Sequence, residues 1–165
     1  MKKTNAARVL DRLKITYEII EYDINEKDLS AEHVATTLGQ PLKQIFKTLV
    51  IRGDRTGILV ACIPGGFELD LKAIASISHN KKAGMVHLKE IKELTGYIRG
   101  GVSPLGMKKN YPSYIDESAF HFPFIFISAG IRGKQLKINP YDLGKALQLI
   151  SGSLVVDSKR NIKIE

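Results

Sequence analysis

The chain has 165 residues, of which 44% are hydrophobic, so one compact domain over residues 1–165 can bury a core without disulfides or metal. No run of about 18 apolar residues occurs, which argues against a membrane span. A single cysteine, Cys62, excludes an internal disulfide and favours a reducing compartment, so we expect a cytoplasmic protein with no membrane partner. The formal charge of +8 indicates a polyanionic partner, although many proteins carry such a charge for solubility alone.

The predicted helices are marked by capping residues that precede apolar residues at helical spacing. Four helix starts occur along the chain, at Thr4, Ser30, Asp70 and Asn139, and a further short helix is expected over residues 88–94. The second helix should end at Gly39, because glycine readily adopts the left-handed conformation that closes a helix. The last helix begins with a proline after its cap and should run to Ile150.

Stretches rich in β-branched and aromatic residues predict the strands. They occupy residues 17–22, 45–52, 58–63, 84–86, 122–128 and 135–138. A glycine-bounded turn joins the second and third strands into a hairpin. Strands outnumber helices and do not alternate with them regularly. We therefore expect an α+β domain built on a mixed, barrel-like sheet with short helices around it.

Lys47 is the most informative single residue of the chain. It lies in the second predicted strand and shares one face with the apolar residues Ile45, Leu49 and Ile51. One interpretation is a lysine that extends past the strand end into solvent. The other is an ammonium group at the floor of a cleft, where it meets a phosphate or a developing oxyanion. The residues around Lys47 leave both interpretations open.

Two glycine-rich segments are further candidates for a site. Residues 100–106 have the sequence GGVSPLG, which either lets the backbone approach a ligand closely or forms a tight turn. The spacing of its glycines matches neither a dinucleotide fingerprint nor a P-loop. Residues 128–135 follow a predicted buried strand. Either they form a charged hairpin turn, or Ser128 lines a pocket while Arg132 and Lys134 face phosphates from its rim.

Several common catalytic arrangements are missing from the sequence. The four histidines lack the spacing of metal ligands, and no G-x-S-x-G motif occurs, which argues against a zinc or serine hydrolase. Cys62 lies within a predicted strand among apolar residues, where a small buried side chain is a better interpretation than a nucleophile. Asp142 lies in the first turn of the last predicted helix, where it complements the helix dipole. We expect no metal and no cofactor.

Four segments occur in a specific order along the chain: FKTL at residues 46–49, TGYIRGGVSPLG at 95–106, ISAGIRGKQ at 127–135 and INPYDL at 138–143. Together they resemble the YbaK family, which is related to the editing insertion of bacterial prolyl-tRNA synthetases and to the free-standing alanyl-tRNA deacylases of the ProX type. The resemblance implies the α+β editing-domain fold. It also implies an enzyme that removes cysteine from mischarged proline tRNA by trans-editing at the acceptor end.

The mechanism of this family uses no protein nucleophile, because the thiol of the esterified cysteine attacks its own carbonyl and releases a cyclic thioester. The resemblance implies that Lys47 orients the terminal adenosine and that Gly101 presents backbone at the ester. It places the remaining site residues around the cleft, namely Tyr22, Thr48, Ser128 and Asp142. Where the family often has an aromatic residue this chain has Leu29, so the shape of that pocket wall should differ.

The expected partners are a tRNA and a synthetase. Four basic residues are expected to contact tRNA phosphates, namely Lys108, Lys109, Arg132 and Lys134. The resemblance also implies a transient complex with prolyl-tRNA synthetase. Two alternatives stay open: removal of alanine by a water molecule held against the ester, and a non-catalytic module that binds tRNA or the synthetase. The segment GGVSPLGMKK favours cysteine over alanine.

Overall fold

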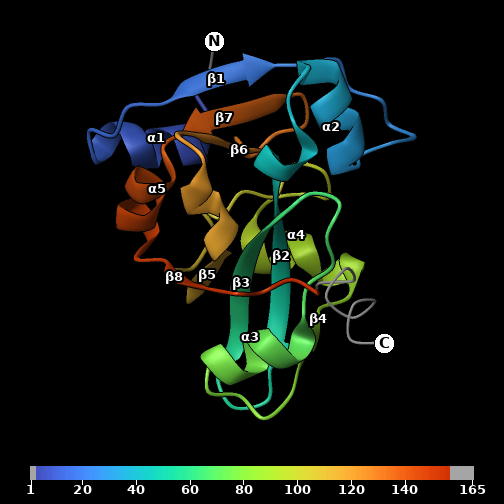
Figure 1. Ribbon diagram of the computed structural model, residues 1–165, viewed down its shortest axis with the longest axis vertical. Coiled ribbons are helices and arrows are strands. Elements are labelled where there is room, and N and C mark those ends of the chain that lie inside the picture. The colour runs from blue at the N-terminus through green and yellow to red at the C-terminus, as the bar shows by residue number, and fades with distance from the viewer. Residues whose placement is uncertain (1–2, 157–165) are drawn as a thin grey trace.

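Short helices and strands alternate along the chain in the computed structural model, which describes residues 3–156 (Figure 1). The helices are α1 (Asn5–Arg12), α2 (Ala31–Leu38), η1 (Leu42–Gln44), α3 (Leu71–Ile77), η2 (Leu88–Glu90), α4 (Ile91–Thr95), η3 (Glu117–His121) and α5 (Pro140–Leu147), where η marks a 3₁₀-helix. The strands are β1 (Glu18–Glu21), β2 (Phe46–Gly53), β3 (Gly57–Pro64), β4 (Ala83–Met85), β5 (Ser113–Asp116), β6 (Ile125–Ser128), β7 (Lys134–Ile138) and β8 (Ile150–Gly152).

The helix starts lie where the capping residues predict them. The side chain of each cap accepts a hydrogen bond from a backbone N–H two or three residues later, at Thr4, Ser30, Asp70 and Asn139. The second helix closes on Gly39 in the left-handed conformation, with φ of 65°. The last helix is shorter than expected: it ends at Leu147 because Gln148 is left-handed, with φ of 53°, and Ile150 already begins β8.

The strands form two sheets within the described residues. One has the order β1-β7-β6 and is antiparallel, and the other has the order β4-β2-β3-β5-β8. The second sheet is mixed, because β2 pairs with β3 and β4 antiparallel whereas β3, β5 and β8 are parallel. A parallel bridge between Ile45 and Phe126 joins the sheets at the start of β2. The prediction of an α+β fold on a mixed sheet is confirmed.

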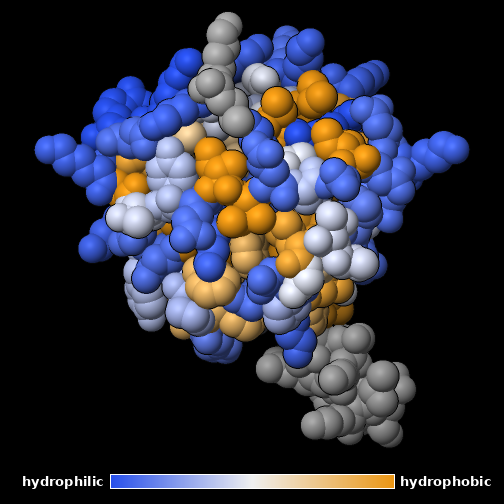
Figure 2. Space-filling view, turned by 90° about the horizontal axis from the view of Figure 1, so that it is seen from above, coloured by the Kyte–Doolittle hydropathy of each residue, from blue (hydrophilic) through white to orange (hydrophobic). Residues whose placement is uncertain are grey.

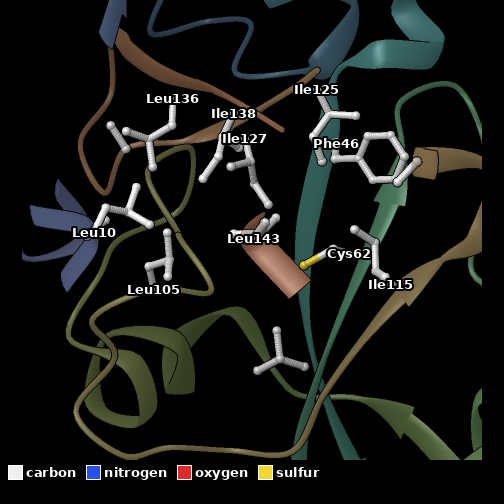
Figure 3. Close-up of a cluster of buried hydrophobic side chains, with 14 residues drawn as sticks. Leu10, Phe46, Cys62, Leu105, Ile115, Ile125, Ile127, Leu136, Ile138 and Leu143 are labelled. Carbon is white, nitrogen blue, oxygen red and sulfur yellow. The ribbon is translucent and has the colours of Figure 1, made fainter. Parts of the chain in front are cut away.

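A cluster of buried apolar side chains lies between the two sheets and against helices α1 and α5 (Figure 3). Both sheets and both helices contribute to it, through residues that include Leu10, Phe46, Cys62, Ile115, Ile127, Leu136 and Leu143. A smaller cluster of Val34, Ala35, Ile45 and Phe126 fixes α2 against the place where the sheets join. The beginning of β2 is therefore held by two sheets and a helix.

Ion pairs link β1 to β7 in the three-stranded sheet. Seen from above, over β1 and α2, hydrophilic residues surround smaller areas of apolar surface (Figure 2). Glu21 and Glu18 of β1 pair with Lys134 and Lys137 of β7 at 3.8 and 3.9 Å. Exposed pairs of this kind contribute at most about 1 kcal/mol each. None of the described helices is long and apolar enough to cross a membrane.

Candidate active site

A cleft of about 390 Å³ opens beside β2. Its walls come from α2 and the loop before it, from the β4, η2 and α4 region, from the loop of residues 99–102, and from the β6–β7 hairpin. Residues far apart in the sequence therefore meet at one place. Five of the predicted site residues line this cleft together, namely Tyr22, Leu29, Lys47, Thr48 and Ser128.

Lys47 provides a positive charge to the cleft. The residue is half-buried, and its Cα lies opposite that of Ile63 in the β2–β3 pairing. Within residues 3–156 the ammonium group has no ion pair and no side-chain hydrogen bond. An ammonium group without a carboxylate partner, beside an apolar wall, is available to an anionic ligand, and the reduced local dielectric strengthens that attraction.

The β6–β7 hairpin contributes two uncharged polar side chains to the cleft, Ser128 and Gln135. The Oγ atom of Ser128 accepts a hydrogen bond from the backbone N–H of Gly130 at 3.1 Å. Gln135 is only 5% exposed, and its buried Oε1 atom has no hydrogen-bond partner among the residues that the structure describes. An unpaired buried acceptor costs about 1–3 kcal/mol, so an N–H group that reached Oε1 would remove this cost.

The sequence alone did not single out Gln135. Gln135 could have been identified from its position seven residues after Ser128, because a turn containing Gly130 and Gly133 separates the two residues. Such a turn pairs the two strands so that Ser128 and Gln135 lie opposite each other. Side chains at paired positions point to the same face of a sheet, so a pocket lined by one is lined by the other.

The two glycine-rich segments pack against each other beside the cleft. Gly101 is buried, and a Cβ atom there would lie 3.1 Å from the backbone nitrogen of Arg132. The N–H of Gly101 donates to the carbonyl of Ile98 at 2.9 Å, and Nε of Arg132 donates to the carbonyl of Arg99 at 2.8 Å. Gly101 thus lies behind the lining of the cleft, where the two loops pack together. Gly100, with φ of 86°, lines the cleft itself.

The remaining predicted residues lie outside the lining of the cleft. Asp142 is half-buried in the first turn of α5, on the opposite side of the molecule from α2 in Figure 1, so it does not complete the cleft. There the negative charge of Asp142 complements the positive N-terminal end of the helix dipole. The Nζ atom of Lys134 lies 3.8 Å from Glu21, and Lys108 and Lys109 are exposed in the loop before β5.

Cys62 does not belong to the cleft but to the core shown in Figure 3, where its side chain is completely buried. Burial raises the pKa of the Cys62 thiol to about 12, although the hydroxyl of Thr48 on the facing strand acts in the opposite direction. The thiol is therefore protonated at neutral pH and is a poor nucleophile. Between residues 3 and 156, no three His, Cys, Asp or Glu side chains gather where they could hold a metal ion.

The rest of the lining defines what the cleft can bind. Its apolar part includes Val34, Ile45, Phe46, Val50 and Ile91. Glu32 and Arg99 line it as well, and both are exposed. A cleft with an apolar wall, an ammonium group and polar side chains from the β6–β7 hairpin can hold a small ligand that carries both a negative charge and an apolar part.

Comparisons with known sequences identify related proteins. Residues 26–146 match the family model of the aminoacyl-tRNA editing domain. The chain is 50% identical over 139 residues to EbsC of Enterococcus faecalis, a candidate Cys-tRNA(Pro)/Cys-tRNA(Cys) deacylase, and the match covers 84% of this chain and 85% of that protein. It is also 32% identical over 80 residues to a proline–tRNA ligase of Thermosipho africanus, which is 48% of this chain and 14% of that enzyme.

Solved structures show the same fold. The chain superposes on a candidate trans-editing enzyme for prolyl tRNA synthetase with a TM-score of 0.79 and 24% identity, over 95% of this chain and 100% of that one. It superposes on the hypothetical protein APE2540 with a TM-score of 0.85 and 20% identity, over 93% of this chain and 100% of that one. At these low sequence identities, the structural similarity shows the fold of the chain alone.

Proposed function

Because the chain belongs to the aminoacyl-tRNA editing domain family, we propose that it is a deacylase that removes cysteine from mischarged proline tRNA in trans. One observation carries the proposal: Lys47, without a carboxylate partner in the described part of the chain, lines the same cleft as Ser128 and Gln135. The 50% identical relative, a candidate deacylase for cysteine on tRNA, supports cysteine as the amino acid removed. Such an enzyme acts in the cytoplasm, where aminoacyl-tRNA is used.

The cleft has the size for the aminoacylated 3′ end of a tRNA. Its volume of about 390 Å³ lies within the range of about 300–1,000 Å³ that small-molecule sites have. Lys47 orients the terminal adenosine and stabilises negative charge that develops at the ester carbonyl. The body of the tRNA stays outside the cleft.

The amino acid occupies the part of the cleft between α2 and the β6–β7 hairpin. Its α-ammonium group donates to Oε1 of Gln135, which satisfies the unpaired acceptor. Ser128 lies beside this contact, and the amino-acid side chain packs toward Tyr22, Leu29 and Thr48. All aminoacyl esters carry the α-ammonium group, so Gln135 binds the substrate while the other residues select its side chain.

The thiol of the substrate supplies the nucleophile. The cysteine sulfur attacks the carbonyl carbon, a C–S bond forms, and the electron pair of the C=O bond moves onto the oxygen as an oxyanion near Lys47. Collapse of this intermediate breaks the bond from the carbonyl carbon to the ribose oxygen, which takes up the proton lost by the thiol. The products are a cyclic thioester and a tRNA with a free ribose hydroxyl. Water then opens the thioester to cysteine.

A substrate that lacks the thiol tests this step. The 2-aminobutyryl group has a methyl group in place of the thiol of cysteine, so on proline tRNA it should enter the cleft and resist cleavage. Release of cysteine but not of 2-aminobutyrate supports a substrate nucleophile. Equal release of both would show that water attacks, and preferential release of alanine would assign the protein to the alanine-removing branch. No release of any amino acid would indicate a tRNA- or synthetase-binding module.

The partner in this proposal is prolyl-tRNA synthetase, in a transient complex that delivers the mischarged tRNA. Support comes from the relatives, since a segment of a proline–tRNA ligase matches this chain over 80 residues. The matching segment is 14% of the synthetase chain and covers 48% of this chain. Co-elution of the two purified proteins in the presence of proline tRNA, and its loss without tRNA, would support a tRNA-dependent complex.

A further inference from the structure

A second concave surface lies on the flank formed by α1, α5 and the loop before β5. It has a volume of about 960 Å³ and shares no lining residue with the cleft. Figure 1 shows α1 and α5 together at one side of the molecule and α2, which borders the cleft, at the other. The charged residues of this surface, here called the basic groove, are Arg8, Arg12, Lys109 and Lys145.

The positive charges of the basic groove are not neutralised. Among the residues that the structure describes, no aspartate or glutamate lines it. Arg8 and Arg12 lie one helical turn apart and therefore on the same face of α1. The carboxylate of α1, Asp11, is bound instead by Lys3 and by the hydroxyl of Tyr17. Across the described residues, the four basic side chains of the groove form no ion pair and no hydrogen bond.

Neutral donors complete the lining of the basic groove. The amide side chains are those of Asn5, Asn110 and Gln148. Guanidinium groups bind phosphates in a planar, two-pronged geometry, and amide N–H groups add uncharged contacts to the same oxygens. A hollow that combines four cations with three amides and contains no acid fits a chain of phosphates better than a flat lipid surface.

Since the proposed function brings an RNA to this protein, we propose that the basic groove binds the phosphodiester backbone of the tRNA at a distance from the ester, an inference that rests on that function. The cleft then binds the aminoacylated end, and the basic groove adds affinity for the tRNA that does not depend on its sequence. Binding through Arg8, Arg12, Lys109 and Lys145 would let one small domain recognise tRNAs by their shared backbone.

The test compares two triple variants that remove the same charge. The groove variant carries Arg8→Ala, Arg12→Ala and Lys145→Ala, and the control variant carries Lys72→Ala, Lys81→Ala and Lys82→Ala, all at exposed positions. The probe is uncharged proline tRNA, and the readout is Kd over a series of KCl concentrations. The groove variant should bind at least about tenfold more weakly, and its slope of log Kd against log salt should fall by about 2–3. The control should change little.

A minimal substrate separates this inference from the proposed function. A cysteinyl ester on a short 3′-terminal oligonucleotide reaches the cleft but not the basic groove, so the groove variant should cleave it at the wild-type rate. Equal losses of tRNA affinity in the groove and control variants would overturn the inference, because the effect would be general charge. Unchanged tRNA affinity with loss of binding to prolyl-tRNA synthetase would also overturn it. If wild type cleaves neither substrate while the groove variant alone loses tRNA affinity, the inference stands and the proposed function fails.

Discussion

Ser128 and Gln135 lie directly opposite each other across the β6–β7 hairpin, and both line the cleft that contains Lys47. Gln135 is also paired with Ile20 on the other side, because β7 is the central strand of its sheet. Its backbone is therefore fixed from both neighbouring strands. The backbone that carries the unpaired Oε1 atom is in place before any ligand arrives, which reduces the conformational entropy that binding must cost.

Replacement of Lys47 by alanine should abolish most of the deacylation. Removal of one group that stabilises a developing oxyanion commonly reduces the rate by about 10²–10³-fold. The free energy of unfolding should stay nearly constant, because within residues 3–156 the ammonium group has no partner to lose. Lys43→Ala, at an exposed position in η1, is the matched control. A folded Lys47→Ala variant with normal kcat/KM would remove Lys47 from the mechanism.

Replacement of Gln135 by leucine should raise stability and lower substrate affinity at the same time. The variant loses a buried, unpaired acceptor, so the free energy of unfolding should increase by about 1 kcal/mol. It also loses the contact to the α-ammonium group, so KM should rise about tenfold. Gln135→Glu keeps an acceptor and should bind better than the leucine variant. Equal KM values for Gln135→Leu and wild type would show that Gln135 does not contact the substrate.

Replacement of Cys62 by alanine should leave deacylation unchanged, because the thiol is buried and protonated at neutral pH. The variant should be less stable by about 1–2 kcal/mol, since it leaves a small cavity in the core. A loss of activity in a folded Cys62→Ala variant would mean that the protein thiol takes part in the reaction.

The stability difference between wild type and Cys62→Ala should depend on pH. Burial raises the pKa of the thiol from 9.0 to about 12, so below pH 9 the thiol is protonated in both the folded and the unfolded state. Between these values only the unfolded thiol ionises, which favours unfolding of the wild type by up to about 1.4 kcal/mol per pH unit. The advantage of the wild type over Cys62→Ala should therefore shrink above pH 9. Denaturant titrations of both proteins at pH 7, 9 and 10 check this, and a constant difference would contradict the burial effect.

Gly101 should be intolerant of a side chain, and Gly144 should not. A Cβ atom at Gly101 would lie 3.1 Å from the backbone of Arg132, so Gly101→Ala should push the two loops of the cleft wall apart and cost about 1–3 kcal/mol. A Cβ atom at Gly144, within α5, meets nothing within 4 Å, so Gly144→Ala should stabilise the helix by about 0.5–1 kcal/mol. Thermal unfolding measures both effects. Deacylation should fall only for Gly101→Ala, and equal activities would show that the wall does not shape the cleft.

Features set by local contacts could be predicted from the sequence. The caps Thr4, Ser30, Asp70 and Asn139 each bond to the first turn of their own helix, so a few neighbouring residues determine them. Strands β5 and β8 were not predicted, because both are short and their positions depend on parallel pairing with distant segments. The early end of α5 has the same origin, since Ile150 belongs to β8.

The candidate site was predicted in part. Lys47 could be identified as a site residue because a charge on an apolar strand face is unusual. Gln135 can be identified as one only from its pairing with Ser128, which the fold creates. Asp142 was placed at the cleft because its segment matches a family signature. The structure turns α5 toward α1 and away from α2, so closeness in sequence to β7 does not bring Asp142 to the cleft.

The cleft beside Lys47 is proposed to release cysteine from proline tRNA. The most direct test is a single-turnover measurement of amino-acid release from cysteinyl- and prolyl-tRNA(Pro), each mixed with an excess of wild-type protein. We expect fast release of cysteine and retention of proline. Equal rates for both esters, or rates no higher than without protein, would contradict the claim.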